Sequence, residues 1–140
     1  MTTAIDTNVL VALWDPDDRF SAAAQAALDT SLRSGALVIA APVFAELLAA
    51  PGRDELFLSS FLRDTGIAVD WHLDETTWRL AARAFRGYAN RRRTSRDPGP
   101  RRILADFLIG AHAVRKGCRL LTLDGRLYRS AFPDLTILPV

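Results

Sequence analysis

Short apolar runs alternate along this chain with stretches in which apolar residues recur at helical spacing. The runs that predict strands cover residues 3–5, 37–40, 67–71 and 119–122, with a fifth at 136–138. The stretches that predict helices cover residues 7–14, 19–33, 42–50, 54–65, 75–92 and 101–116. Helices between successive strands imply crossover connections, which join parallel strands. The pattern therefore predicts an α/β fold, with a mostly parallel central sheet of four to five strands and helices on both faces.

Length and composition exclude several other classes of protein. A chain of 140 residues fits a single domain, which we expect to span residues 1–140. One cysteine, Cys118, excludes an internal disulfide framework, and two histidines leave no Cys/His zinc site. The longest apolar run, residues 36–45, is about half of the roughly 20 residues that a membrane-spanning helix needs. The N-terminus lacks the basic segment of a signal peptide, so we expect a cytoplasmic protein with no membrane partner.

Four carboxylates stand among apolar neighbours, where an ionised acid is rarely found unless it is paired or bound to a metal. They are Asp6, Glu46, Asp106 and Asp124. Each also has an ordinary explanation: Asp6 could cap the helix that follows it, and Glu46 could pair with an arginine. Asp106 could pair with Arg102 one helical turn away, and Asp124 could serve a turn.

Three of these acids are expected at the same edge of the sheet. Asp6 and Asp124 each follow a predicted strand, and Glu46 lies early in the helix after the second strand. Ligands gather at the carboxyl ends of the strands in such folds. The helix that carries Asp106 precedes the fourth strand, and we expect its start at the opposite edge. A carboxylate cluster without His or Cys favours Mg²⁺ or Mn²⁺, which suits phosphoryl chemistry.

A basic stripe, residues 79–102, contains nine arginines and one acid. Its net charge is +8, whereas the rest of the chain carries −6. Such a stripe is typical of a protein that binds a polyanion, although a solvated helix face gives the same pattern. The expected RNA contacts lie around the predicted loop at residues 94–100, and they are Arg91, Arg92, Arg93 and Arg96.

Four motifs in order make the chain resemble the PIN-domain nucleases, and among them the VapC toxins of bacterial toxin–antitoxin pairs. The motifs are Asp6-Thr7-Asn8-Val9-Leu10, Phe44-Ala45-Glu46-Leu47, Asp106-Phe107-Leu108-Ile109-Gly110 and Leu121-Thr122-Leu123-Asp124. The resemblance spans nearly the whole chain. One departure is Arg126, which occupies a place where many relatives carry a further acid.

The resemblance implies an α/β/α sandwich and a metal-dependent ribonuclease that acts as a toxin. It implies a homodimer, an RNA substrate and a cognate VapB-type antitoxin. It also implies that Asp106 joins Asp6, Glu46 and Asp124 in one acidic site. This differs from the expectation above, in which the helix that carries Asp106 starts at the opposite edge of the sheet.

Roles for the site residues follow as a hypothesis. Asp6, Asp106 and Asp124 would hold Mg²⁺ or Mn²⁺, and Glu46 would hold a water on the metal or act as the base. Hydrogen bonds that orient these carboxylates are expected from Thr7, Asn8 and Thr122, for which ordinary capping or strand chemistry is an equal alternative.

Two other functions remain open from the sequence. A metal-dependent phosphatase or phosphotransfer domain also uses aspartates at a sheet edge, but Asn8 replaces the second acid of the usual Asp-x-Asp pair. Activity on small phosphate esters would favour it. A non-catalytic RNA-binding module has no need for four acids, and RNA binding that ignores EDTA without cleavage would favour it.

Overall fold

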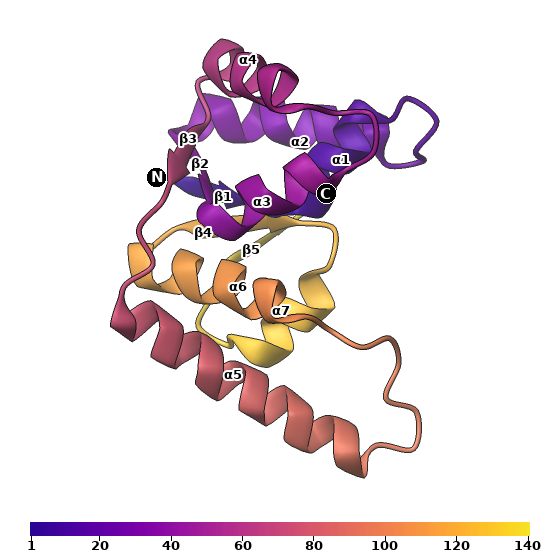
Figure 1. Cartoon of the computed structure of the whole chain (residues 1–140), viewed down its shortest axis with the longest axis vertical. Coiled ribbons are helices and arrows are strands. Elements are labelled where there is room, and N and C mark those ends of the chain that lie inside the picture. Colours follow the sequence, from indigo (N-terminus) through magenta and orange to yellow (C-terminus); the bar gives the residue numbers. More distant parts are fainter.

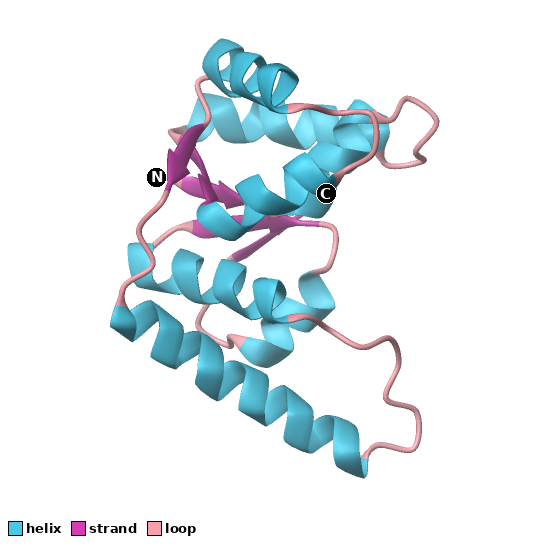
Figure 2. Cartoon of the chain, in the orientation of Figure 1, coloured by secondary structure: helices cyan, strands magenta, loops and turns pink.

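Five parallel strands form the centre of the molecule in a computed structural model that describes residues 1–140. The strands are β1 (Thr3–Ile5), β2 (Leu37–Ala40), β3 (Ala68–Asp70), β4 (Arg119–Thr122) and β5 (Ile137–Pro139). Their order in the sheet is β3-β2-β1-β4-β5, and every neighbouring pair is parallel. In Figure 2 the strands lie between two groups of helices. The predicted parallel sheet and its layering are therefore confirmed.

Seven helices surround the sheet. They are α1 (Thr7–Trp14), α2 (Ser21–Ser34), α3 (Ala41–Ala49), α4 (Glu55–Thr65), α5 (Glu75–Thr94), α6 (Leu104–Lys116) and α7 (Gly125–Ala131). Figure 1 shows α2 and α4 on one side of the sheet, and α5, α6 and α7 on the other. α3 begins directly after β2 and contacts both α1 and α6. None of the seven combines the length and the apolar character that crossing a bilayer requires.

Helices on both faces explain why the central strands are apolar throughout. Ala4 and Ile5 of β1 and Leu120 and Leu121 of β4 are all at most 2% exposed. A strand that is covered on both faces reads as a continuous apolar run, without the alternation of a one-sided sheet. Cys118, just before β4, is buried and free, as expected for a small core residue.

Several element boundaries differ from those that the sequence predicts. α6 begins at Leu104 and not at Arg101, because the backbone N–H of Arg102 donates to the Tyr88 hydroxyl (2.7 Å) and the chain is still extended at Ile103. The helix α7 was not predicted. It is short and begins with Gly125, so its apolar residues make too brief a pattern to identify from periodicity.

Gly110 of α6 shows why a small residue is needed inside a helix. A Cβ atom at this position would lie 2.3 Å from the ring of Phe132, the residue that follows α7. The missing side chain therefore serves close packing, one of the two interpretations that the sequence allowed. His112 is also structural: it is 1% exposed, and its Nε2 lies 2.9 Å from Oδ2 of Asp70.

Candidate functional site

The carboxyl ends of β1 and β4 open onto the switch point of the sheet. These strands are neighbours, but the chain continues from β1 toward β2 on one side and from β4 toward β5 on the other. Open α/β sheets bind ligands in the crevice that this divergence creates. Asp6 follows β1 directly, and Asp124 lies two residues beyond β4.

Asp6 is held rigidly between the two strands and is 4% exposed. Its Oδ2 accepts a hydrogen bond from the Thr122 hydroxyl (2.8 Å), and its backbone N–H donates to the carbonyl of Leu121 (3.0 Å). Its Oδ1 accepts from the N–H of Thr7 (2.8 Å), so Asp6 also caps α1 as the ordinary interpretation predicts. Burial raises the pKa of Asp6 to about 6 and the charge of Asp106 adds to the rise, although the hydrogen bonds from Thr122 and Thr7 oppose it.

Glu46 reaches the same edge from α3 and bonds to Thr7. The Thr7 hydroxyl donates to Oε1 of Glu46 at 2.5 Å. Burial raises the pKa of Glu46, the bond from Thr7 counteracts the rise, and the nearby charge of Asp106 adds to it. The alternative in which Glu46 pairs with an arginine is wrong, since no arginine forms an ion pair with it.

Asp106 lies in the first turn of α6, at the carboxyl edge of the sheet. The expectation that this helix starts at the opposite edge is wrong. α6 ends at Lys116, immediately before β4, so it runs back along the sheet and its first turn lies where the strands end. Oδ2 of Asp106 accepts from the N–H of Ile103 (3.3 Å). Burial raises the pKa of Asp106, the hydrogen bond from Ile103 and the charge of Arg102 oppose the rise, and the charge of Asp124 adds to it.

Asp106 is the centre of the acidic site. Its charge influences the pKa of Asp6 and of Glu46, and its own pKa responds to Asp124. The fold therefore brings together all four carboxylates that the sequence singles out, from β1, α3, α6 and the β4–α7 junction. Four carboxylates that repel one another and bring no His or Cys suit a hard divalent cation. In this conformation, no group of three or more His, Cys, Asp or Glu side chains is arranged to hold a metal ion.

Arg102 occupies the outer side of this site. Its Nη1 lies 2.5 Å from Oδ2 of Asp124, and the two side chains are 33% and 24% exposed. Sequence reasoning paired Arg102 with Asp106, its neighbour at helical spacing, and that pairing is wrong because α6 begins only at Leu104. The ion pair occupies Oδ2 of Asp124 and leaves Oδ1 without a hydrogen bond or ion pair.

The predicted orienting residues join the two central strands. Thr122 Oγ1 donates to Asp6 and accepts from the N–H of Asp124 (2.9 Å). Asn8 does not bond to a carboxylate as predicted: its Oδ1 accepts from the N–H of Leu123 (3.1 Å), which ties the segment after β4 to the first turn of α1. Thr7 and Thr122 thus donate to the carboxylates of Glu46 and Asp6, and Asn8 holds the backbone next to Asp124.

Tyr128 was not identified from the sequence. It is 1% exposed, and its hydroxyl is close enough to Asp6 to lower the pKa of that carboxyl, yet it makes no hydrogen bond of normal geometry. Burial and the negative charges of Asp6 and Asp106 hold the pKa of Tyr128 far above its usual value, so the hydroxyl stays protonated. Only the packing of α7 against the sheet reveals this donor, and no local pattern marks it.

The arginines of the basic stripe are not equivalent. Arg91, Arg93 and Arg96 are exposed, as expected for residues that contact a polyanion. Arg92 is half-buried, and its Nη1 donates to the carbonyls of Gly99 (2.8 Å) and Pro98 (3.2 Å). Arg92 therefore fixes the loop before α6. Arg126, in contrast, is exposed and without a hydrogen bond, as its solvated interpretation predicts.

Comparisons with known proteins agree with this architecture. The family model described as PIN domain matches residues 3–133. No curated protein sequence matches the chain significantly.

Solved structures resemble the chain over nearly its whole length. One is VapBC2 from Rickettsia felis bound to a promoter DNA fragment, with TM-score 0.72 and 17% identity over 99% of this chain and 98% of that one. VapBC-1 from nontypeable Haemophilus influenzae has TM-score 0.72 and 16% identity, with the same coverage. VapC20 of Mycobacterium tuberculosis, a Sarcin-Ricin loop cleaving toxin, has TM-score 0.55 and 16% identity over 86% of this chain and 87% of that one. At such low sequence identity, the structural similarity shows that these proteins share the fold of this chain.

Proposed function

The chain belongs to the PIN domain family, and from that premise we propose that it is a Mg²⁺- or Mn²⁺-dependent endoribonuclease that acts as the toxin of a toxin–antitoxin pair. The observation that supports this proposal is the acidic site: four carboxylates from separate elements lie at the carboxyl edge of the sheet, and the charge of Asp106 acts on Asp6 and Glu46. The arginines of residues 79–102 supply the complementary charge for a polyphosphate backbone.

In this proposal Asp6, Asp106 and Asp124 hold the cation. A Mg²⁺ or Mn²⁺ ion bound there supplies Lewis acidity toward a phosphate oxygen and toward the attacking water. Thr122 orients the carboxylate of Asp6 through its 2.8 Å hydrogen bond. The rigid Asp6 carries the largest cost of burial in the set, which a cation would relieve.

Glu46 acts as the general base. Its carboxylate accepts the proton of the attacking water as the water oxygen bonds to phosphorus and the bond from phosphorus to the leaving oxygen breaks. The leaving oxygen takes up a proton from solvent water. A raised pKa makes the carboxylate a better proton acceptor, and burial gives Glu46 that property. Thr7 fixes the direction of the carboxylate by donating to Oε1.

The toxin assignment and the antitoxin partner are supported by the resemblance to the VapBC structures of Rickettsia felis and Haemophilus influenzae. We further propose a homodimer. Two tryptophans, Trp71 and Trp78, are 62% and 46% exposed, and large apolar side chains at a surface favour a protein partner.

The test is metal-dependent cleavage of RNA. Purified protein is incubated with total cellular RNA in Mg²⁺, in Mn²⁺ and in EDTA, and new 5′ ends are mapped by sequencing. Discrete ends that need the metal and disappear in Asp6→Asn are expected. Asp134→Asn, an exposed aspartate, is the matched control and should cut like the parent.

Other outcomes identify the rival functions. Identical end maps for the parent and Asp6→Asn would remove the support for catalysis by Asp6. Hydrolysis of small phosphate esters in its place would indicate a phosphatase, and metal-independent RNA binding without cleavage would indicate a binding module.

A further inference from the structure

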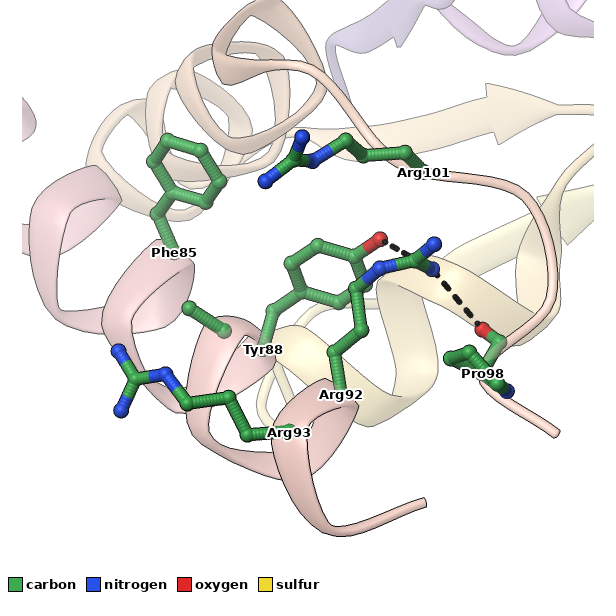
Figure 3. Close-up of a pocket in the computed structure, with 7 residues that line it drawn as sticks. Phe85, Tyr88, Arg92, Arg93, Pro98 and Arg101 are labelled. Atoms are coloured by element: carbon green, nitrogen blue, oxygen red, sulfur yellow. Dashed lines mark hydrogen bonds between the residues drawn. The ribbon is translucent and has the colours of Figure 1, made fainter. Parts of the chain in front are cut away.

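A pocket of about 400 Å³ lies between the C-terminal half of α5 and the loop that leads to α6. Its lining includes two aromatic rings, three arginines and a proline, which are Phe85, Tyr88, Arg92, Arg93, Arg101 and Pro98 (Figure 3). Sites for small ligands in proteins begin at about this volume. The pocket is separate from the acidic site and has no role in the mechanism above.

Hydrogen bonds fix the wall of this pocket. Arg92 donates to the carbonyls of Pro98 and Gly99, and Figure 3 shows it between Pro98 and the Tyr88 hydroxyl. The Tyr88 hydroxyl in turn accepts from the backbone N–H of Arg102 (2.7 Å). The loop is thus tied to α5 at several points, and the pocket exists before any ligand binds.

Two of the three arginines are available to a ligand. The guanidinium of Arg101 makes no hydrogen bond or ion pair, and it extends across the pocket toward Phe85 in Figure 3. The guanidinium of Arg93 bonds only to the side chain of Asn90 (3.0 Å). No carboxylate lines the pocket, so its positive charge is not neutralised. In Figure 3 the guanidinium of Arg93 points away from that of Arg101, so Arg101 is the free cation beside the rings. A phosphate group is a natural counterpart of a guanidinium group.

The aromatic side chains of the pocket form one cluster with Phe107 of α6. The ring of Phe85 lies 4.9 Å from the ring of Phe107, and 6.3 Å from that of Tyr88. Phe107 follows Asp106 directly. Arg101 likewise precedes Arg102, whose guanidinium contacts Asp124. The pocket and the acidic site therefore share the start of α6 and the loop before it.

We propose that this pocket binds one nucleotide of a single-stranded RNA next to the phosphodiester that lies at the acidic site. The base packs against Phe85 and Tyr88, and the phosphate of that nucleotide binds Arg101, whose guanidinium extends toward Phe85. Aromatic rings accept any base, so the pocket strengthens binding and sets the direction of the strand. This proposal rests on the proposed function, since it assumes that RNA is the substrate.

The test measures RNA binding in the Asp6→Asn background, which should bind without cutting. The probe is a short fluorescein-labelled single-stranded RNA of mixed sequence, titrated by anisotropy between about 50 and 200 mM salt. Arg101→Ala should weaken binding and lower the salt slope by about one. Arg33→Ala, which removes an exposed arginine on α2, is the charge-matched control and should leave the slope unchanged.

A second pair of variants tests stacking of the base. Phe85→Leu keeps an apolar side chain but removes the ring, and it should weaken binding by about tenfold. With a probe that carries abasic positions, the same variant should bind like its parent. Phe57→Leu, a ring exposed on α4, is the control. Urea unfolding of each variant verifies that it is folded.

The failures of the two proposals are distinguishable. If Asp6→Asn binds no RNA at any salt concentration, the proposed function fails together with the pocket. If Asp6→Asn binds RNA and the parent cuts it, but Arg101→Ala and Phe85→Leu bind like their controls, the pocket alone is wrong. A loss of binding in Arg96→Ala equal to that in Arg101→Ala, without any dependence on the base, would also refute it in favour of a diffuse charged surface.

Discussion

Replacing Asp6 with asparagine should stabilise the metal-free protein at neutral pH even though it removes a proposed catalytic group. Asp6 is 4% exposed, and burial raises its pKa to about 6 from an ordinary value of 3.8. A carboxylate with such a pKa is less stable as an ion in the folded protein than in the unfolded chain. Its charge therefore lowers the free energy of unfolding wherever it is ionised in both states.

The magnitude follows from the pKa and the hydrogen bonds. A rise from 3.8 to about 6 corresponds to about 3 kcal/mol. Asparagine keeps an oxygen that accepts from the Thr7 N–H, but its amide faces the Thr122 hydroxyl, which must change from donor to acceptor. That change costs about 1 kcal/mol. The net gain is about 2 kcal/mol, equivalent to a rise in Tm of roughly 5–8 °C for a domain of this length.

The sign of the pH dependence is fixed by the direction of the shift. Between pH 3.8 and about 6 the folded parent binds more protons than the unfolded chain, so its stability falls as pH rises through this window. Below pH 3.8 Asp6 is protonated in both states and the penalty is absent. The advantage of Asp6→Asn should therefore appear as pH rises from 4 to 6 and stay constant above.

Urea unfolding in EDTA, repeated across this pH range, measures the difference between variant and parent. Acids remote from the site titrate equally in both proteins and cancel from it, whereas the interaction of Asp6 with the charge of Asp106 is part of the measured difference. Asp134→Asn, an exposed aspartate, is the control and should show no such change. A variant that is no more stable than the parent at pH 7.5, or a difference that does not vary with pH, would refute the assigned burial penalty.

Three further predictions concern metal binding and packing. Added Mg²⁺ should raise the Tm of the parent, by the equivalent of about 2.7 kcal/mol at 100 times its Kd, and should leave Asp6→Asn unchanged; equal shifts in both would locate the metal elsewhere. Gly110→Ala should lower the free energy of unfolding by about 1–3 kcal/mol, because its Cβ would overlap the Phe132 ring. Gly87→Ala is the control, since its Cβ would meet only the flexible side chain of Arg91. Equal urea midpoints for the two variants would contradict this packing. Asp70→Ala removes the partner of buried His112 and should lower the free energy of unfolding by about 1–3 kcal/mol near pH 7. The loss should be smaller in acid, because the pKa of Asp70 is lowered in the fold and its contribution disappears once it is protonated. A loss that does not vary with pH would contradict the pairing.

Local patterns were enough to predict the sheet and most of its helices. The apolar run Leu37–Ala40 predicts a buried strand, and the helical spacing of apolar residues over 75–92 predicts a helix with one buried face. Both patterns arise from burial within a single element, so they can be recognised locally. The four acids were identifiable for a related reason, because a carboxylate inside an apolar run conflicts with its surroundings. Asp6 follows its strand directly and Asp124 lies two residues after another, and parallel strands end at the same edge.

The tertiary structure decided which residues from different elements lie next to one another in the site. The position of Asp106 follows from the direction of α6 along the sheet, and the pair of Arg102 with Asp124 joins residues 22 positions apart. The Tyr88 hydroxyl accepts from the N–H of Arg102 and holds this residue in the extended segment before α6, so Arg102 is not one helical turn from Asp106 and pairs with Asp124. Tyr128 has no local signal, since only the packing of α7 buries its hydroxyl beside Asp6.

The sequence by itself thus identified the four acids of the site, because a charged carboxylate stands out among the apolar residues next to it in the chain. Partners, pKa values and the arginine pocket required the folded chain, because each depends on atoms that distant segments bring together.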